Sequence, residues 1–125
     1  MVLPREITDA NDHVKQQWDV VVFDEATDSL VFVEVKHHFT LAASCESIEK
    51  FDMLPELLQQ TTTQELRALA DKRKILMIGG GIFDKRAAEM AINQKIPVWY
   101  PSGSRYTFEG FDQTTEDLKD HLLTV

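Results

Sequence analysis

The hydrophobic positions of the chain fall into short blocks that predict different elements. Val20–Phe23 and Leu30–Val33 are apolar runs rich in valine and phenylalanine, and the polar stretch 24–29 between them has the composition of a turn. Such runs are typical of β-strands, and the pair predicts a hairpin over residues 19–36. Residues 5–17 are polar and predict at most one or two helical turns.

Apolar residues recur at helical spacing over residues 44–59, where Ser44 or Ser47 is of a type suited to cap the helix. Pro55 lies inside this pattern, so we expect it to kink or divide the helix. A second helical piece is expected over 62–72, because its first residues have the capping-box form Thr-x-x-Glu.

The next part of the chain predicts a strand, a helix and a strand. Lys74–Gly79 is almost continuously apolar, as expected of a strand covered on both faces, and the glycines 79–81 predict a tight turn into a helix. Asp84 is a suitable N-cap for a helix over 85–94, and a strand is expected over 96–100. This order predicts parallel strands with a crossover helix. The last expected elements are a short edge strand over 105–108 and an amphipathic helix over 115–123.

The complete order is hairpin, helix, strand, helix, strand and a small C-terminal addition. It predicts an α/β fold with a mixed β-sheet flanked by helices. The chain has 125 residues, no internal repeat and no low-complexity linker, so we expect residues 1–125 to form a single domain. This domain is either a whole protein or a part excised from a larger one.

Composition limits the classes of function. The net charge of −8 argues against a nonspecific nucleic-acid coat protein, which needs a basic face, but not against a nuclease whose bound metal ions add positive charge. The single cysteine, Cys45, favours a reducing, intracellular compartment. No apolar run approaches the length of a membrane span and no signal peptide is recognisable, so no membrane partner is expected.

Three charged residues of the predicted hairpin carry the candidate chemistry. Asp19 opens the first strand, and Glu34 and Lys36 close the second, so pairing of the strands gathers them at one edge of the sheet. Glu34 and Lys36 lie two residues apart and therefore share a face. Carboxylates are ligands of hard cations such as Mg²⁺, and a cation with a lysine beside it suits phosphodiester hydrolysis.

Asp19, fourteen intervening residues and Glu34-Val35-Lys36 form a pattern that resembles the PD-(D/E)XK, or restriction-endonuclease-like, nuclease superfamily. The downstream segment MIGGGIFDKRAAEMAINQKIPVWYP, residues 77–101, is similar to the strand–helix–strand segment of its Mrr-type and Holliday-junction-resolvase-type members. The resemblance covers roughly residues 15–101. Trp18 stands where the superfamily has the proline of its name.

The resemblance implies a restriction-endonuclease-like fold and a Mg²⁺- or Mn²⁺-dependent endonuclease that acts on nucleic acid, DNA rather than RNA. It implies that Asp19, Glu34 and the carbonyl of Val35 hold the metal, and that Lys36 orients the attacking water or stabilises the transition state. Many members add a glutamate from an N-terminal helix, for which Glu6 is a weak candidate. His38 is a second weak candidate. The resemblance also allows a homodimer or membership of a larger complex.

Other interpretations remain open at this point. One is a catalytically inactive interaction domain on the same fold within a larger assembly, which the acidic charge and Trp18 favour. Another is a solvated strand end in which Glu34 and Lys36 have no chemical role. A third is a nucleotide-binding α/β domain that uses the glycines 79–81, although no Lys-Ser/Thr pair follows them.

Overall fold

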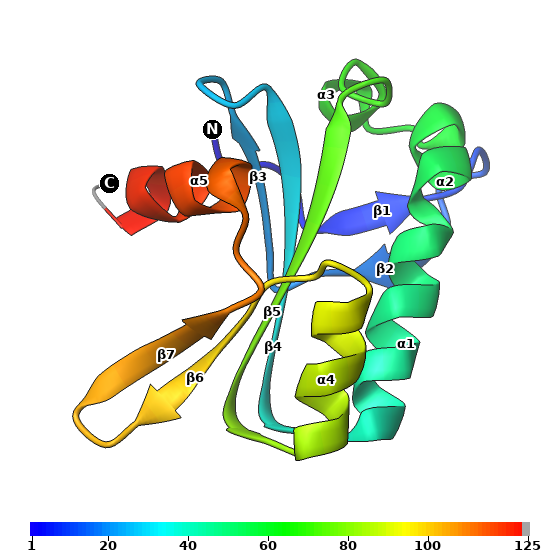
Figure 1. Ribbon diagram of the computed structural model, residues 1–125. Helices are drawn as coiled ribbons and strands as arrows, with labels where there is room; N and C mark the ends of the chain where they lie inside the picture. Colours follow the sequence, from blue (N-terminus) through cyan, green and yellow to red (C-terminus); the bar gives the residue numbers. More distant parts are fainter. Residues whose placement is uncertain (124–125) are drawn as a thin grey trace.

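The computed structural model describes residues 1–123 and is built on a five-stranded mixed sheet (Figure 1). The strands lie in the order β3-β4-β5-β6-β7, with β4, β5 and β6 parallel and the two outer strands antiparallel to their neighbours. Their bounds are β3 (Val20–Asp24), β4 (Ser29–Phe39), β5 (Arg73–Phe83), β6 (Val98–Ser102) and β7 (Arg105–Glu109). The expected mixed sheet with flanking helices is thereby confirmed.

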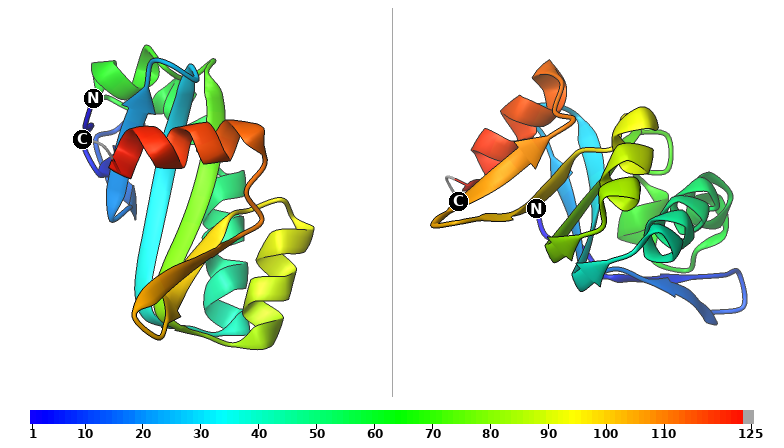
Figure 2. Two further views of the ribbon diagram at one scale, coloured as in Figure 1. Left: turned by 60° about the vertical axis from the view of Figure 1, so that its left-hand side comes forward. Right: turned by 60° about the horizontal axis from the view of Figure 1, so that its bottom comes forward.

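Helices cover the two faces of the sheet unequally. One face carries α1, α2 and α4, whereas α5 alone lies across the other (Figures 1 and 2). The bounds are α1 (Leu41–Asp52), α2 (Leu54–Gln60), α3 (Gln64–Arg67), α4 (Lys85–Asn93) and α5 (Gln113–Leu123). A smaller sheet of β1 (Glu6–Thr8) and β2 (Val14–Gln17) packs beside α2. Within residues 1–123, no helix has both the length and the apolar character that crossing a membrane requires.

The side chains of β4 alternate between two apolar clusters, as the pleat of a strand requires. Leu30 and Phe32 join the larger cluster with Trp18 and the helices α1 and α2, and all three side chains are almost fully buried. Val31 and Val33 join a smaller cluster under α5 on the opposite face. Because both of its faces carry apolar side chains, β4 is anchored on both sides of the sheet.

The predicted hairpin of β3 and β4 is confirmed, with Val20 opposite Val33 and Asp24 opposite Ser29. Its turn is held by Asp24, whose Oδ2 accepts hydrogen bonds from the backbone and the hydroxyl of Thr27 at 3.0 and 2.6 Å. Asp28 completes the turn in the left-handed region, at φ 53°, which aspartate tolerates better than most residues.

The helical region after β4 confirms one expectation and corrects two. Pro55 does divide the helix, and it lies in the first turn of α2, where a missing N–H leaves no hydrogen bond unmade. The cap of α1 is Thr40, whose Oγ1 accepts from Ala43 N at 3.1 Å, whereas Ser44 and Ser47 are buried within the helix. The expected helix over 62–72 is reduced to the four residues of α3.

The glycines 79–81 lie inside β5 and form no turn, which corrects the prediction. A Cβ on Gly79 would lie 2.1 Å from Cε2 of Trp99, so the missing side chain lets the indole lie against the sheet. Cβ atoms on Gly80 and Gly81 would lie 2.9 and 3.0 Å from carbonyl oxygens of β4. The glycines therefore serve close packing. No phosphate-binding loop precedes α4, so the basis for a nucleotide-binding domain is removed.

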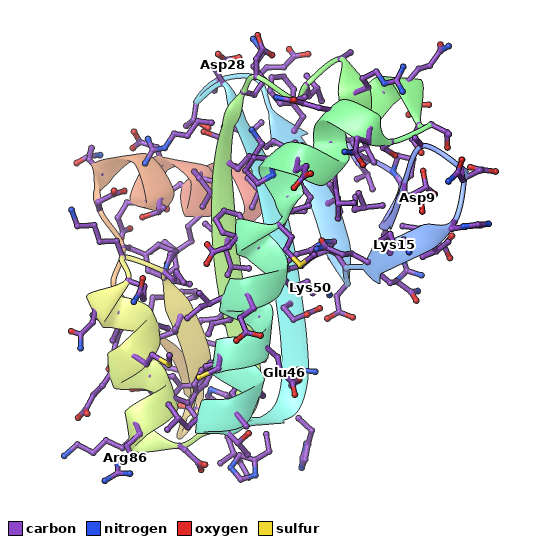
Figure 3. The ribbon with its side chains drawn as sticks, turned by 90° about the vertical axis from the view of Figure 1, so that its right-hand side faces the viewer. Asp9, Lys15, Asp28, Glu46, Lys50 and Arg86 are labelled. Carbon is purple, nitrogen blue, oxygen red and sulfur yellow. The ribbon has the colours of Figure 1, made fainter. Side chains whose placement is uncertain are left out.

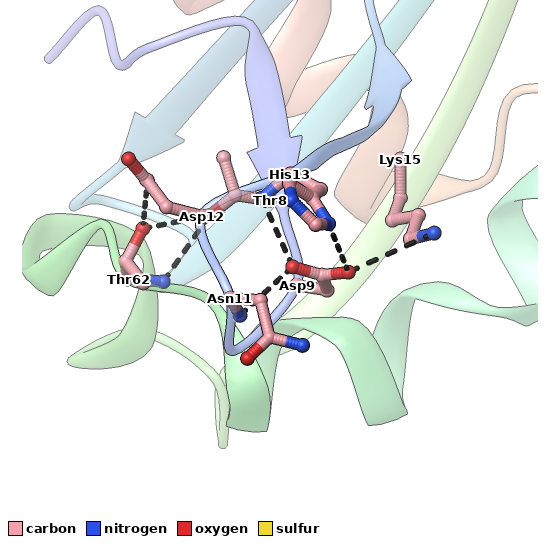
Figure 4. A network of polar contacts seen from close by, with 7 residues as sticks. All are labelled: Thr8, Asp9, Asn11, Asp12, His13, Lys15 and Thr62. Carbon is pink, nitrogen blue, oxygen red and sulfur yellow. Dashed lines mark hydrogen bonds and ion pairs between the residues drawn. The ribbon is translucent and has the colours of Figure 1, made fainter.

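Residues 5–17 form the β1–β2 hairpin, where at most a helical turn was expected. Ile7 pairs with Gln16 across this hairpin. Thr8 fixes this hairpin to the end of α2, since its hydroxyl lies 2.9 Å from the hydroxyls of both Thr61 and Thr62. Figure 4 shows Thr8 beside Thr62. Contacts more than 50 residues apart in sequence thus select the strand conformation.

Asp9 stabilises the tip of this hairpin, and the stabilisation should depend on pH. Hydrogen bonds from the backbone N–H groups of His13 and Asn11 hold the pKa of the Asp9 carboxyl below its ordinary value of 3.8 (Figure 4). A lowered folded pKa stabilises the protein above the ordinary value, and this contribution is lost as pH falls through the folded value. We therefore expect Asp9→Asn to lower the free energy of unfolding at neutral pH but not in strong acid.

Urea denaturation of the wild type and of Asp9→Asn across acid and neutral pH measures this difference. Asp71→Asn, which removes a carboxylate at an exposed position, is the control. If the free energies of unfolding of Asp9→Asn and of the wild type differ by the same amount at every pH, the prediction is contradicted.

Candidate functional site

The structure brings Asp19 and Glu34 together at the start of β3. Asp19 precedes the strand, and its backbone N–H donates to the carbonyl of Val33 at 3.2 Å. The paired register of β3 and β4 begins with Val20 opposite Val33, so this bond sets Asp19 beside Val33 as well, at a bend just before the ladder and one residue from Glu34 of β4. Asp19 and Glu34 thus lie near each other along the hairpin, but Glu34 is in the middle of β4, which runs from Ser29 to Phe39, and does not close the strand as expected.

The Asp19 carboxylate also accepts a backbone hydrogen bond from β4 that β3 leaves unmade. This strand has 11 residues and continues to Phe39, beyond the point where β3 begins. Val35 N–H consequently has no partner in β3, and it donates to Asp19 Oδ2 at 2.7 Å. Asp19 Oδ1 makes no hydrogen bond to any residue within 1–123, so one oxygen stays available to a ligand.

Glu34 is 9% exposed and is held by a residue that sequence reasoning missed. Lys50, from α1, donates to Glu34 Oε2 at 2.9 Å and to the carbonyl of Gln17. Its ammonium also lies 4.0 Å from the centroid of the Trp18 ring. Glu34 Oε1 has no partner in the described part of the chain. The sequence indicated Lys50 only indirectly, because a carboxylate buried in an apolar strand requires a positive charge beside it.

Lys36 lies two residues beyond Glu34 on the same face of β4 and is partly exposed. Its ammonium makes no ion pair or hydrogen bond with the residues that the structure describes. Val35 between them turns to the opposite face and is 49% exposed, as the alternation of strand side chains predicts. An uncommitted ammonium therefore stands on the same face as the paired carboxylate.

The two weaker candidates, Glu6 and His38, are not brought into contact with this pair. Glu6 is exposed at the start of β1, opposite Gln17, and it lies in a strand rather than in the N-terminal helix that the resemblance implies. His38 Nε2 lies 2.7 Å from Asp84 Oδ1, so the imidazole is directed to the start of α4.

The donors present fit a hydrated Mg²⁺ ion better than a metal bound by protein alone. Within the described residues, no three side chains of histidine, cysteine, aspartate or glutamate are placed to share one ion. Mg²⁺, however, commonly retains several waters and binds through one or two carboxylates. Asp19 and Glu34 each present one unshared oxygen of this hard type, beside the Val35 backbone.

The surroundings of the site are not basic. A cleft of 630 Å³ beside Lys50 separates the β1–β2 hairpin from α1 and α2. Figure 3 shows Asp9 and Lys15 on the hairpin side, with Lys50 and Glu46 on α1. The ionisable residues that line this cleft are Asp9, Lys15, Glu46, Glu49, Lys50 and Glu56. Carboxylates thus outnumber ammonium groups in this cleft.

Most residues of the two basic segments, Lys72–Lys74 and Lys85-Arg86, are paired with acids or carbonyls. Lys72 lies 3.1 Å from Asp28, and Arg73 lies 3.9 Å from Asp112. Lys74 donates to two backbone carbonyls near the end of α3. These contacts leave little free positive charge there for a phosphate backbone.

Comparisons of the chain with protein-family models, with curated proteins and with solved structures found no match.

Proposed function

We propose that this protein is a Mg²⁺-dependent endonuclease of the PD-(D/E)XK type, acting on DNA in preference to RNA. The observation that carries the proposal is the hydrogen bond from Val35 N–H to Asp19 Oδ2, which places this carboxylate one residue from Glu34 in β4, with one uncommitted oxygen on each carboxylate. The order hairpin, helix, strand, helix, strand supports a restriction-endonuclease-like arrangement of the sheet. The single cysteine supports an intracellular location.

Each residue has a distinct part in this proposal. A divalent cation held by Asp19 and Glu34 would supply Lewis-acid activation of water and neutralise phosphate charge. Asp19 is oriented for this by the N–H of Val35, and Glu34 by the ammonium of Lys50. Lys36, on the same face and free of protein partners in the described region, would stabilise negative charge that develops on the scissile phosphate.

Cleavage assays test the proposal directly. Supercoiled duplex DNA, branched DNA and single-stranded RNA are each incubated with Mg²⁺, Mn²⁺ or EDTA. Cleavage of DNA with either metal and none with EDTA is the expected result. A protein that binds Mn²⁺ by calorimetry but cuts none of these substrates would contradict the catalytic assignment.

A second function, a non-catalytic interaction domain on the same fold, is favoured by one contact. The Lys50 ammonium already lies 2.9 Å from Glu34, where it supplies positive charge that a metal ion would otherwise bring. The pair is largely shielded, with side-chain exposures of 23% for Lys50 and 11% for Glu34. In this interpretation the ion pair is structural and the site needs no metal.

The substitution Lys50→Met separates the two functions. Without metal it leaves the Glu34 carboxylate shielded and unpaired, so the free energy of unfolding should fall by about 1–3 kcal/mol. If the site binds metal, Mn²⁺ should restore stability in proportion to its occupancy, and more strongly than in the wild type. Thermal denaturation with Mn²⁺ and with EDTA measures both effects.

Lys15→Met provides the matched control, because Lys15 lines the same cleft but is 53% exposed and lies 3.7 Å from Asp9. It should change stability little and should not alter the response to Mn²⁺. A Lys50→Met protein that Mn²⁺ leaves unchanged would favour the interaction domain.

A further inference from the structure

The outer edge of β7 is an open strand edge, unlike the opposite edge of the sheet. β7 pairs with β6 on one side and is the last strand of the sheet. In Figure 1 the β6–β7 hairpin projects from the sheet, and the end that carries its turn lies away from the helices. At the other edge the N-terminal segment covers β3, with Leu3 N donating to Val21 O and Phe23 N donating to Met1 O, both at 2.9 Å. An open edge is a template for another strand.

The sequence of β7 is complementary to itself. Its five residues are Arg105, Tyr106, Thr107, Phe108 and Glu109, with Thr107 in the middle. When two copies of the strand pair antiparallel about Thr107, Arg105 lies opposite Glu109 of the second copy, and Tyr106 opposite its Phe108. Each of the two Arg105–Glu109 pairs then joins opposite charges, which stabilises the pairing of the strands.

The backbone of β7 presents its hydrogen-bonding groups in the same register. Gly103, at φ 64°, and Ser104 form a two-residue turn, so Ser102 and Arg105 form the hydrogen-bonded pair next to it. Pairs alternate along an antiparallel ladder, so the N–H and C=O groups of Tyr106 and Phe108 point outward. In the self-paired register these two residues face each other and form hydrogen-bonded pairs.

The side chains at this edge include large apolar surfaces that the fold leaves exposed. Tyr106 is 63% and Phe108 37% exposed. They lie on the same face of β7 and line a groove of 430 Å³ together with Met77 and Trp99. Phe111 and Lys119 close the α5 side of this groove, and the Lys119 ammonium lies 4.8 Å from the centroid of the Phe108 ring. Self-pairing would set the two aromatic residues of each copy beside those of the other, which removes apolar surface from water.

The two charged ends of the strand are free to pair across such an interface. Glu109 Oε1 accepts the Tyr100 hydroxyl at 2.6 Å, a bond that raises the pKa of that phenol. Oε2 of Glu109 remains available to an arginine. Arg105 is exposed and makes no ion pair within residues 1–123.

From these features we propose that β7 is the interface of a symmetric homodimer, in which a second copy of this chain continues the sheet. The occupant is a second copy because the edge matches itself in charge, in backbone hydrogen bonding and in aromatic surface. The same patch serves both subunits, as a two-fold axis through Thr107 requires. The proposal stands independently of nuclease activity.

A charge-swap experiment tests this dimer. Arg105→Glu places two like-charged pairs at the interface, Glu with Glu, and Glu109→Arg places Arg with Arg. Each variant alone should dimerise about tenfold or more weakly than the wild type. Mixed in equal amounts, the two variants regain opposite charges at both pairs and should form a heterodimer with roughly wild-type affinity. Sedimentation equilibrium over a concentration series measures all three.

Arg86→Glu, on the exposed face of α4, makes the same change in net charge and should leave dimerisation unaltered. Recovery in the mixture also shows that both variants are folded, and circular dichroism of each checks this separately. A wild type that stays monomeric at every concentration would overturn the proposal. A dimer that Arg105→Glu leaves intact, or one that mixing fails to restore, would also overturn it by locating the contact elsewhere.

Discussion

Replacing Asp19 by asparagine should lower metal-dependent cleavage at least about a hundredfold while leaving the fold intact. The asparagine carbonyl can still accept the Val35 N–H that Asp19 Oδ2 accepts now, so the end of β3 keeps its hydrogen bond. The substitution removes the negative charge, however, and with it one of the two hard ligands of a divalent cation. Cleavage rates and Mn²⁺ calorimetry on the same preparation measure both losses.

Asp28→Asn is the matched control, because Asp28 lies at the far end of the same hairpin, in a left-handed conformation that asparagine adopts readily. The Asp28→Asn protein should cleave DNA at the wild-type rate. Lys36→Met adds a second distinction, since loss of cleavage with retained Mn²⁺ binding would separate charge stabilisation from metal binding. Cleavage that survives Asp19→Asn unchanged would show that the activity belongs to another site.

Trp18→Ala should lower the free energy of unfolding by about 3–5 kcal/mol. Trp18 is 1% exposed, its ring centroid lies 5.4 Å from that of Phe32, and its Nε1 donates to Gln16 Oε1 at 3.1 Å. Alanine leaves a cavity in the main apolar cluster and a buried amide oxygen without its donor. Guanidinium denaturation followed by circular dichroism measures the loss.

Trp99→Ala is the comparison, since Trp99 is only partly buried and lines the open groove. Its removal should reduce stability by about 1–2 kcal/mol. Equal losses in the free energy of unfolding for the two substitutions would contradict the larger contribution expected of Trp18.

The β3–β4 hairpin could be predicted because every signal for it is local. The apolar runs Val20–Phe23 and Leu30–Val33 have a strand composition, and the residues between them form a compatible turn. Once those runs pair, Asp19 necessarily lies near the middle of β4, where its carboxylate accepts the Val35 N–H. The proximity of Asp19 to this part of β4 was therefore predictable, whereas the bend at Asp19 was not.

The features that were missed depend on distant contacts. Three successive glycines are compatible with a turn or with a strand, and the approach of Trp99 decides for the strand. The β1–β2 hairpin depends on Thr8 meeting Thr61 and Thr62. Lys50 is one of several charged residues on α1, and only the packing of that helix against β4 shows that it reaches Glu34.

The β6–β7 hairpin joins the rest of the sheet through a short seam. β6 pairs with β5 at two positions, Ile78 with Val98 and Gly79 with Trp99, whereas it pairs with β7 along its whole length. The hairpin is thus a unit whose direction is set where the indole of Trp99 rests on Gly79. In a dimer joined through β7, that contact would fix the distance between the Asp19 carboxylates of the two subunits.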